Sequence, residues 1–454
     1  MANYGLLTLL PALLVIVLAI KSKRTTEPLI IGCVVSYIII YGLKFVPPLV
    51  DTFFGVITDY DNVWIIVTTG LFGSLIALLN ASHGTHALAN KLRKICKSGK
   101  STLLLSWIFG VIIFIDDYLN IMTINSCMRR LSDKNKVPRE SLAYVVDSTG
   151  SPTCVLVPLS GWAIFYSEAF FAQEAVRNLG YGSAMEAYVH AIPFIFYAIV
   201  SLLLVLLFVL GVIPKIGPMK KAYTRVETTG MVYSENSRKL NTNEDNSDEG
   251  KSNIIDFIIP MGLMIAISVI FDDIFLGLIA SIVACLLLYV PRKIMKMSEF
   301  CDMWIHGFAD TIPMSAIIVA ALCMRTASSN IGLPEYVVQH VMPFVTQRTF
   351  PAVAFLVVSI LAFITGSNWG IPAVCIPIIV PLGAACGANI LLVMGAIVSG
   401  GVFSSHACYY SDTTVLTSAY TGIDNVEHVT TQLPYAIIGL VISFAVFMVC
   451  GFIL

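Results

Sequence analysis

Long apolar stretches, separated by short polar loops, follow one another along almost the whole chain. A stretch of roughly 17–25 apolar residues is long enough to cross a lipid bilayer as a helix. The pattern predicts such spans at 4–20, 28–46, 62–80, 141–165, 190–213, 254–271, 274–290, 310–327, 389–411 and 432–453. Two further apolar stretches, 101–128 and 350–387, do not fit single straight spans. We therefore expect an all-α polytopic membrane protein.

The middle of stretch 101–128 carries two adjacent carboxylates and an amide, Asp116, Asp117 and Asn120. Basic residues flank the stretch: Lys91, Arg93, Lys94, Lys97 and Lys100 before it, and Arg129, Arg130, Lys134, Lys136 and Arg139 after it. Because basic loops stay on the cytoplasmic side, the stretch should enter and leave there, as a re-entrant hairpin with the carboxylates at its tip. Carboxylates at membrane depth are functional candidates. The alternatives are a solvated loop, and an Asp that caps a half-helix.

The longest polar segment, 214–253, divides the chain into halves of similar size. It begins with basic residues and continues into an acidic stretch rich in Asn and Ser. Low hydrophobicity and mixed charge predict a flexible cytoplasmic linker between a first repeat, 1–213, and a second repeat, 254–454. The loop 21–24 is basic and 51–61 is acidic, which places the N-terminus outside.

The two halves show the same order of features. Residues 114–117 in the first apolar hairpin correspond to 363–366 in the second. Each tip is followed, after a similar gap, by a helix that small polar residues interrupt, at 147–152 and at 404–414. The topology opens hairpin 101–128 to the cytoplasm and hairpin 350–387 to the outside. Halves of opposite orientation, each with a re-entrant hairpin and a discontinuous helix, are typical of secondary transporters with inverted repeats.

The first break reads Asp147-Ser148-Thr149-Gly150-Ser151-Pro152. Pro152 removes a backbone donor and Gly150 loosens the helix, so carbonyl groups become available. Together with the hydroxyl groups and Asp147, these carbonyls suit a dehydrated cation or a carboxylate substrate. The alternative is a kinked helix whose Ser and Thr bond back to the backbone. That alternative accounts for Ser148 and Thr149 but not for Asp147.

The second half offers hydroxyls, amides, one histidine and one acid. The candidates are Ser367 and Asn368 at the hairpin tip, and Ser405, His406, Asp412 and Thr413 at the helix break. Hydroxyl and amide groups coordinate ions or hydrogen-bond a substrate. Trp369 fits an interface belt and a substrate pocket equally well. His406 is a candidate for proton uptake, with a simple hydrogen-bonding role as the alternative.

Composition excludes several other classes. Of the 454 residues, 57% are hydrophobic and 12% are charged, whereas soluble domains carry about 25% charged residues. The net charge is −1 and the basic residues cluster in short loops, which argues against a nucleic-acid partner. The 11 cysteines are scattered through apolar segments, so a disulfide framework is not expected. The pair His83 and His86 lacks a helical Glu between its members, so an enzyme is not expected.

Four segments carry a resemblance to a known family. They read FIDDYLNIMT, MRRLSDKNKVPRESLAYVVDSTGSPTCVLVPLSGWA, SDTTVL and DNVEHVTTQLPYA. These segments resemble the signature of the NhaC-type Na⁺/H⁺ antiporter family, and the resemblance covers nearly the whole chain. It implies the ion-transporter superfamily fold, with two inverted repeats. Members exchange Na⁺ for H⁺, and some relatives move organic acids or amino acids with ion coupling.

One departure from the family pattern concerns the second break. The family has Gly-Asp-His before the SDTT motif, followed by Cys or Lys and then Ser-Pro. Here the same positions read Ser404-Ser405-His406-Ala407-Cys408-Tyr409. An acid is thus replaced by Ser405 and a proline by Tyr409. The loss of one carboxylate lowers the number of cations or protons that the second half-site can balance. A broken helix that carries hydroxyl groups and a Tyr ring could instead accommodate an organic substrate.

These features predict a secondary active transporter of the cytoplasmic (inner) membrane that exchanges Na⁺ for H⁺. The alternative is a Na⁺- or H⁺-coupled carrier of a small organic acid or amino acid. One half-site would contain Asp116, Asp117, Asn120, Asp147, Ser148, Thr149 and Ser151, and the other Ser367, Asn368, Ser405, His406, Asp412 and Thr413. Asp116, Asp147 and Asp412 are the expected Na⁺ ligands, and no cofactor is expected. The expected partners are the bilayer, the transported ions and solute, and a second copy of the chain.

Overall fold

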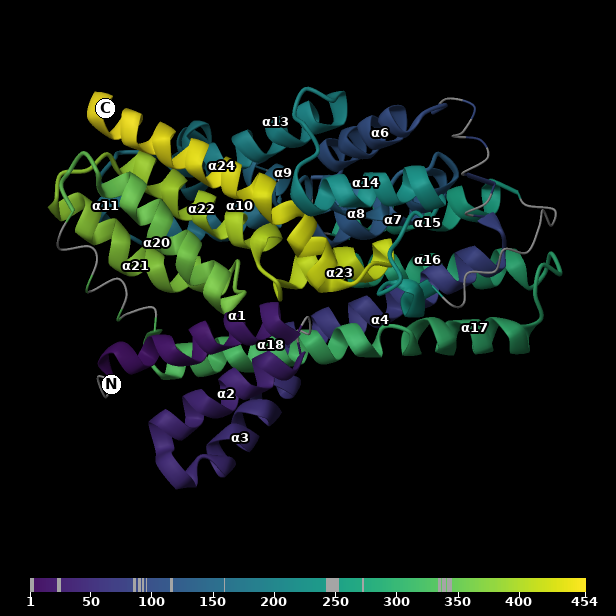
Figure 1. Cartoon of the computed structure of the whole chain (residues 1–454), viewed down its shortest axis with the longest axis horizontal. Coiled ribbons are helices and arrows are strands. Elements are labelled where there is room, and N and C mark those ends of the chain that lie inside the picture. Colours follow the sequence, from purple (N-terminus) through teal and green to yellow (C-terminus); the bar gives the residue numbers. More distant parts are fainter. Residues whose placement is uncertain are drawn as a thin grey trace.

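The computed structural model describes residues 4–22, 26–84, 87–88, 91, 94, 96–114, 117–158, 160–241, 253–271, 273–333, 336, 340 and 345–454. Within these ranges every regular element is a helix. Asp116, at the predicted tip of the first hairpin, lies outside the described residues. The helices form two layers that run along the length of the molecule (Figure 1).

The lower layer contains helices from both halves of the chain (Figure 1). It consists of α2 (Thr26–Tyr41), α3 (Val46–Thr58), α4 (Tyr60–Ala81), α17 (Met297–Ala309) and α18 (Ile312–Asn330). Helix α4 packs closely on α17, because Gly73 and Gly307 face one another. A Cβ at Gly307 would lie 2.6 Å from the Cα of Ser74. Small residues let helix backbones approach in this way.

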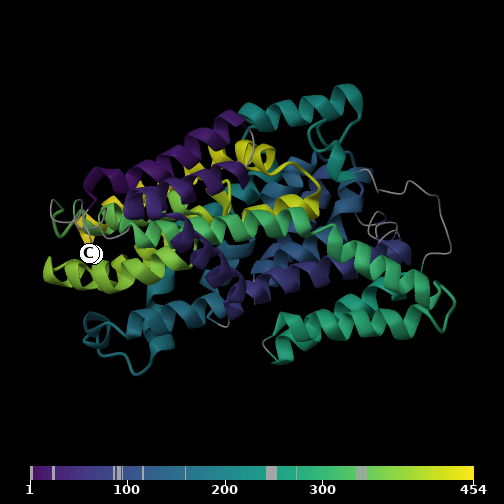
Figure 2. The ribbon, with the colours of Figure 1, turned by 90° about the horizontal axis from the view of Figure 1, so that it is seen from below.

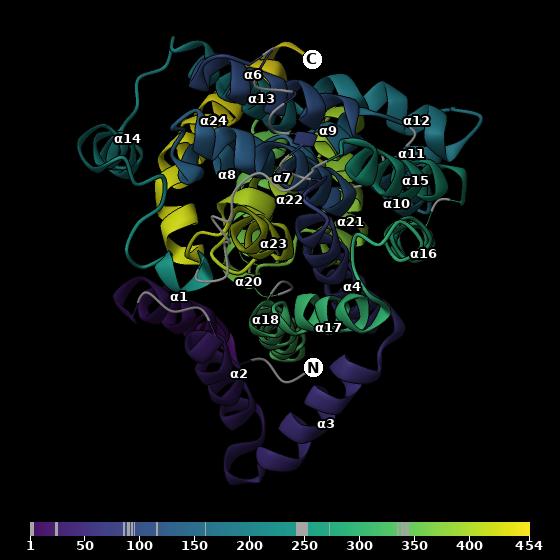
Figure 3. The same cartoon turned by 90° about the vertical axis from the view of Figure 1, so that its right-hand side faces the viewer.

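The upper layer holds most of the polar residues that the sequence singled out. Its first-half helices are α6 (Gly99–Ile112), α7 (Asp117–Lys134), α8 (Arg139–Asp147), α9 (Gly150–Leu156), α10 (Gly161–Phe171) and α13 (Phe196–Leu210). Its second-half helices are α20 (Phe350–Thr365), α21 (Gly370–Ala385), α22 (Ile390–Ala407), α23 (Asp412–Thr421) and α24 (Asn425–Ile453). Viewed along the layers, α22 and α23 lie at the centre, with α24, α8 and α7 around them (Figure 3).

The remaining helices lie around these layers. They are α1 (Leu10–Ser22), α11 (Glu174–Arg177), α12 (Ala184–Ala191), α14 (Gly217–Thr229), α15 (Ile255–Phe271) and α16 (Ile274–Tyr289), with short 3₁₀ turns η1 (Gly5–Leu9), η2 (Gly42–Lys44), η3 (Ile192–Phe194) and η4 (Arg238–Asn241). Helices α15 and α16 pack against each other at the end of the molecule remote from the C-terminus (Figure 2).

The helix breaks fall at the predicted polar positions. Helices α6 and α7 pack on each other on either side of 113–116, and α20 and α21 do so on either side of 366–369. Gly366 ends α20 with φ 67°, a left-handed backbone that glycine adopts without strain. The two interrupted helices break at 148–149, between α8 and α9, and at 408–411, between α22 and α23.

By length and hydropathy, four helical stretches within the described residues are able to cross a membrane. They are Thr26–Lys44, Asn62–Ala81, Ile390–Thr421 and Asn425–Ile453, and two bent pairs of helices raise the number to six. Most other predicted spans appear as shorter apolar helices of 10–17 residues. The chain is a multi-pass membrane protein. Within the described residues, fewer helices are long enough to span a membrane than the ten expected from the sequence, and two of the expected spans are bent pairs of helices.

Two polar segments differ from their predictions. The segment 51–61, expected to be an acidic loop, is mostly helical: it contains the end of α3 and the start of α4. Asp59, between the two helices, caps α4 by accepting a hydrogen bond of 3.1 Å from Asn62 N. The described part of the expected flexible linker, 214–241, is folded. Arg225 of α14 makes a two-pronged ion pair with the buried Glu140, at 2.7 and 2.9 Å. This contact ties α14 to the start of α8.

Candidate functional site

The polar side chains of the helix breaks form two groups. The first, which we call the Asp147 cluster, is Asp147, Thr414, Thr417, His428 and Gln432. The second, the Asp412 pocket, is an open cavity that ends at Asp412. The start of α23 contributes to both groups, with Asp412 in the pocket and Thr414 in the Asp147 cluster.

Asp147 is the last residue of α8 and is 1% exposed. Its Oδ2 accepts a hydrogen bond of 2.7 Å from Gln432 Nε2. The hydroxyl groups of Thr414 and Thr417 on α23 lie 3.4 Å from its two oxygens. Helix α8 of the first half and the consecutive helices α23 and α24 of the second half thus enclose one carboxylate, whose hydrogen-bond partners are an amide and two hydroxyl groups.

His428 completes the Asp147 cluster from one turn before Gln432 on α24. Its Nε2 lies 2.9 Å from Gln432 Oε1 and 3.5 Å from Asp147 Oδ2, and its Nδ1 lies 2.8 Å from Ser418 Oγ. Because a side-chain carbonyl oxygen only accepts, Nε2 donates to Gln432. A carboxylate, an imidazole and an amide thus form one buried network, which is suited to holding a proton or a cation.

His406 is buried at the end of α22, beside the cluster. Its Nε2 lies 2.8 Å from the hydroxyl group of Tyr197, on whose ring the imidazole stacks at 5.4 Å. Its backbone carbonyl accepts a hydrogen bond from Gln432 Nε2. These contacts give His406 a structural hydrogen-bonding role, while its proposed part in proton uptake stays a prediction.

The backbone carbonyl of Ser405 connects the two groups. It accepts hydrogen bonds from the hydroxyls of Thr413, at 2.6 Å, and Thr414, at 2.8 Å. Thr413 N in turn donates to Asp412 Oδ1 at 2.8 Å, while Thr414 lies against Asp147. The hydroxyl of Ser405 itself donates to the Val402 carbonyl at 2.8 Å. Neighbouring residues of one helix therefore tie the two carboxylates to the same carbonyl.

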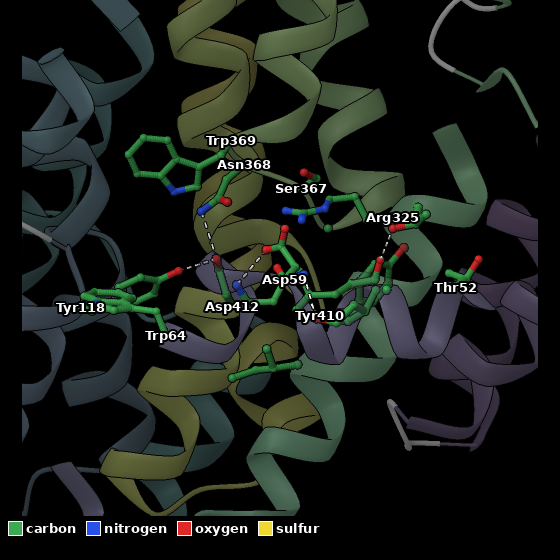
Figure 4. Close-up of a pocket in the computed structure, with 18 of the residues that line it drawn as sticks. Thr52, Asp59, Trp64, Tyr118, Arg325, Ser367, Asn368, Trp369, Tyr410 and Asp412 are labelled. Atoms are coloured by element: carbon green, nitrogen blue, oxygen red, sulfur yellow. Dashed lines mark hydrogen bonds between the residues drawn. The ribbon is translucent and has the colours of Figure 1, made fainter. Parts of the chain in front are cut away.

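The Asp412 pocket has a volume of about 720 Å³ and lies between the two layers (Figure 4). Helices α3, α4 and α18 line it from the lower layer, and α7, α10 and the breaks near 366–369 and 410–412 line it from the upper layer. Asp412 accepts a hydrogen bond of 2.6 Å from the Tyr118 hydroxyl at Oδ2, and one of 3.1 Å from Asn368 Nδ2 at Oδ1. The pocket therefore ends on an oriented carboxylate.

Among the described residues, the charged ones that line the pocket are Asp59, Arg325 and Asp412. Trp369 forms part of the wall, with its ring centroid 4.0 Å from that of Trp162 and 5.0 Å from that of Phe165. This position matches the pocket interpretation of Trp369. Ser367, which the sequence proposed as a ligand, also caps α21, because its Oγ accepts from Gly370 N at 3.0 Å.

Asp117 and Asn120, at the start of α7, stabilise the first hairpin. The buried Asp117 accepts a hydrogen bond of 2.8 Å from Ser151 Oγ at its Oδ2. Asn120 Nδ2 donates to the carbonyls of Gly110 and Ile113, both at 2.7 Å, and so satisfies the end of α6. The hairpin is thus tied to the first helix break through a carboxylate.

Ser148 and Thr149 occupy the first break itself. Thr149 Oγ1 bonds back to the carbonyls of Val145 and Val146, at 2.8 and 3.1 Å, as the kinked-helix alternative predicted. The Ser148 carbonyl accepts from Ser201 Oγ at 3.3 Å. Helix α13, which carries Ser201, therefore packs against the first break and satisfies one of its free carbonyls.

The structure brings some predicted site residues together and separates others. Asp117 meets Ser151, Asn368 meets Asp412, and Ser405 meets Thr413. Asp147 and Asp412, both predicted as Na⁺ ligands, have different hydrogen-bond partners, and their binding of Na⁺ stays a prediction. The described residues contain no group of three or more His, Cys, Asp or Glu that could hold a metal ion.

Sequence reasoning missed several residues of the two groups, among them Tyr118, Arg325, His428 and Gln432. His428 and Gln432 stand four positions apart in the segment DNVEHVTTQLPYA, a spacing that puts both on one helix face. Tyr118 directly follows Asp117. These two signals were visible in the sequence, whereas Arg325 is followed by Thr326 and by the polar run 328–330, and nothing in this pattern indicates that it faces a pocket.

A family model described as the Na⁺/H⁺ antiporter family matches residues 168–452. The chain belongs to this family. An uncharacterized protein from Haemophilus influenzae is 26% identical over 467 aligned positions, which cover 94% of this chain and 88% of that protein. A malate-2H⁺/Na⁺-lactate antiporter from Bacillus subtilis is 27% identical over 148 positions, and an arginine/ornithine antiporter from Halobacterium salinarum is 29% identical over 154.

Each of these two shorter matches covers about a third of both chains, 33% of this one and 32% of the relative. The family and these relatives are transporters rather than enzymes. The antiporter family member described here is therefore a membrane transporter, with antiport as its class of activity.

Proposed function

We propose that this protein is a secondary antiporter that couples the movement of a small organic solute to Na⁺ or H⁺. The open cavity of about 720 Å³ that ends at Asp412 carries this proposal. Pockets for small molecules occupy about 300–1,000 Å³, whereas a bare cation fits among a few oxygen atoms. The aromatic wall around Trp369 also suits an organic solute better than an ion.

The coupling ion would use the Asp147 cluster. A buried carboxylate that is surrounded by hydroxyl, amide and imidazole groups can hold either a cation or a proton. The shared Ser405 carbonyl supports coupling, because a change in the position of Thr414 at Asp147 also moves its neighbour Thr413 at Asp412. In alternating access, the ion and the solute would bind from opposite sides in turn.

Exchange of Na⁺ for H⁺ without an organic solute is the second candidate. Membership of the family favours it, and the buried carboxylates Asp117 and Asp147 support it. In this version a cation and protons would compete for the same carboxylates, and Na⁺ would bind at Asp116, Asp147 and Asp412.

The proposal includes a membrane placement. Hairpin α6–α7 would be re-entrant from the cytoplasm, and hairpin α20–α21 from the outside, as the halves of an inverted repeat. The basic residues around the first hairpin and their scarcity after Arg348 support this placement in the cytoplasmic membrane.

Flux measurements test the proposal. Proteoliposomes with an imposed Na⁺ or pH gradient and an internal pH dye would be supplied with labelled amino acids, malate or lactate. Gradient-driven accumulation of one of these solutes would support the proposal. Proton movement that depends on Na⁺ alone, with no solute taken up, would instead establish the second candidate.

A further inference from the structure

We propose that the Asp412 pocket binds an α-amino acid, whose carboxylate pairs with Arg325 and whose ammonium group pairs with Asp412. This inference rests on the proposed function and names the class of solute. Figure 4 shows Arg325 of α18, Asp59 of the turn between α3 and α4, and Asp412 of α23 directed into the same cavity.

Arg325 supplies the site for a carboxylate. It lies on α18, half-buried, and within the described part of the chain its guanidinium group has no ion-pair or hydrogen-bond partner. A guanidinium group presents N–H donors in a planar fork that matches a carboxylate. A partly buried arginine without an anionic partner is unfavourable. A carboxylate from a ligand would satisfy it.

The turn after α20 brings Arg325 close to Asp412. A Cβ at Gly370 would lie 3.4 Å from Arg325 Cδ, so the arginine stem passes against the start of α21. Two residues before Gly370, Asn368 donates to Asp412 at 3.1 Å. Arg325 and Asp412 therefore both contact the short turn 366–370 and line the same cavity, where the carboxylate and the ammonium group of one ligand would reach them.

Asp412 retains capacity for an ammonium group. A carboxylate offers about four acceptor positions. Oδ1 accepts from Asn368 and from the backbone N of Thr413, whereas Oδ2 accepts from Tyr118. These bonds fix the orientation of the carboxylate and leave Oδ2 able to accept a further hydrogen bond from the cavity.

The balance of charge among the described residues of the pocket favours a cationic side chain on the amino acid. Of these residues, two carboxylates, Asp59 and Asp412, face one guanidinium group, that of Arg325. A ligand with one carboxylate and two cationic groups neutralises this set, a neutral amino acid leaves one negative charge, and an acidic one leaves two. The expected order of affinity is therefore lysine, then leucine, then glutamate, with malate last.

Binding measurements on the purified, full-length protein in detergent test this inference. Thermal unfolding and titration calorimetry would compare lysine with cadaverine, which lacks its carboxylate, and with 6-aminohexanoic acid, which lacks its α-amino group. We expect both analogues to bind at least about tenfold more weakly, the loss that follows from one charged hydrogen-bonded contact.

Three variants locate the contacts. Arg325→Gln should weaken lysine binding at least about tenfold without weakening that of cadaverine, which has no carboxylate to pair with Arg325, and Arg325→Lys should be intermediate. Asp59→Asn should reduce the preference for lysine over leucine. Arg177→Gln, an exposed arginine on α11 that is remote from the pocket, is the matched control and should bind as the unmodified protein does.

The outcomes separate this inference from the proposed function. If malate or lactate binds as tightly as lysine, or if Arg325→Gln binds lysine normally, the amino acid assignment is wrong while an organic solute is retained. If none of these solutes binds and only Na⁺ or pH shifts the unfolding temperature, the proposed function fails as well.

Discussion

The side-chain amide of Gln432 donates a hydrogen bond of 2.7 Å to the carboxylate of Asp147, which lies 285 positions earlier in the chain. The same amide nitrogen contacts the backbone carbonyl of His406. The last helix is thus joined to the first helix break and to the second break by one side chain. Any movement of α24 relative to α8 must break or exchange these bonds.

Asp147→Asn should abolish ion-coupled transport and leave the fold intact. The amide has the same volume and still accepts from Gln432, but it has no charge to exchange between a cation and a proton. Flux in proteoliposomes and the unfolding temperature in detergent would be measured together. Asp302→Asn, on the exposed side of α17, serves as the control. Full gradient-driven flux from Asp147→Asn would remove the carboxylate from the mechanism.

Tyr118→Phe should raise the KM for the solute about tenfold with a smaller change in kcat. The phenol donates at 2.6 Å to Asp412 Oδ2, and a hydrogen bond to a charged group contributes about 1.5–3 kcal/mol. Without this bond the carboxylate is less well oriented at the end of the pocket. Initial uptake rates over a range of solute concentrations measure both constants. Tyr41→Phe, an exposed tyrosine on α2, is the control and should behave as the unmodified protein.

Arg225→Gln should destabilise the protein by about 3 kcal/mol, because it leaves the buried carboxylate of Glu140 without its ion-pair partner. The double variant with Glu140→Gln should regain much of this loss, since no buried charge then remains. Arg238→Gln removes an exposed ion pair with Glu235 and should not change the unfolding temperature. Equal effects of Arg225→Gln and Arg238→Gln would show that α14 is not anchored through Glu140.

Gly110→Ala should destabilise the first hairpin by about 1–3 kcal/mol. The new Cβ would lie 2.6 Å from Thr149 Cβ, so α6 would have to move away from the first helix break. Gly262→Ala on α15 has no atom within 4 Å of the new Cβ and should leave stability unchanged or raise it by about 0.5 kcal/mol. Thermal unfolding of both variants tests how tightly α6 packs against the break.

The sequence predicted where helices are interrupted, because the causes of interruption are local. Gly366 requires a left-handed backbone, and the polar residues at 147–152 stand out in an apolar helix. Helices α3 and α17 were not anticipated as separate elements. Val46–Thr58 is short and includes Asp51, and Met297–Ala309 carries several charges, so neither reads as a membrane span.

The contents of the site were only partly predictable, since its contacts join residues far apart in sequence. Asn120 was expected to bind an ion, which stays a prediction, but that its amide also caps α6 depends on how the hairpin closes. Arg325 faces the pocket only because α18 packs against the turn after α20. No local pattern in the sequence contains that information.

The two hydrogen bonds to the Ser405 carbonyl limit how a sodium ion can be coordinated at the second break. A carbonyl oxygen has two lone pairs, and here both are engaged by the hydroxyls of Thr413 and Thr414. This oxygen cannot coordinate an ion while both hydroxyls remain. An ion that used it would displace one threonine, and the released hydroxyl would then be free to join the ion's own ligand shell. If an ion binds there, the occupied and empty states of this family member would differ by the rotation of one threonine side chain.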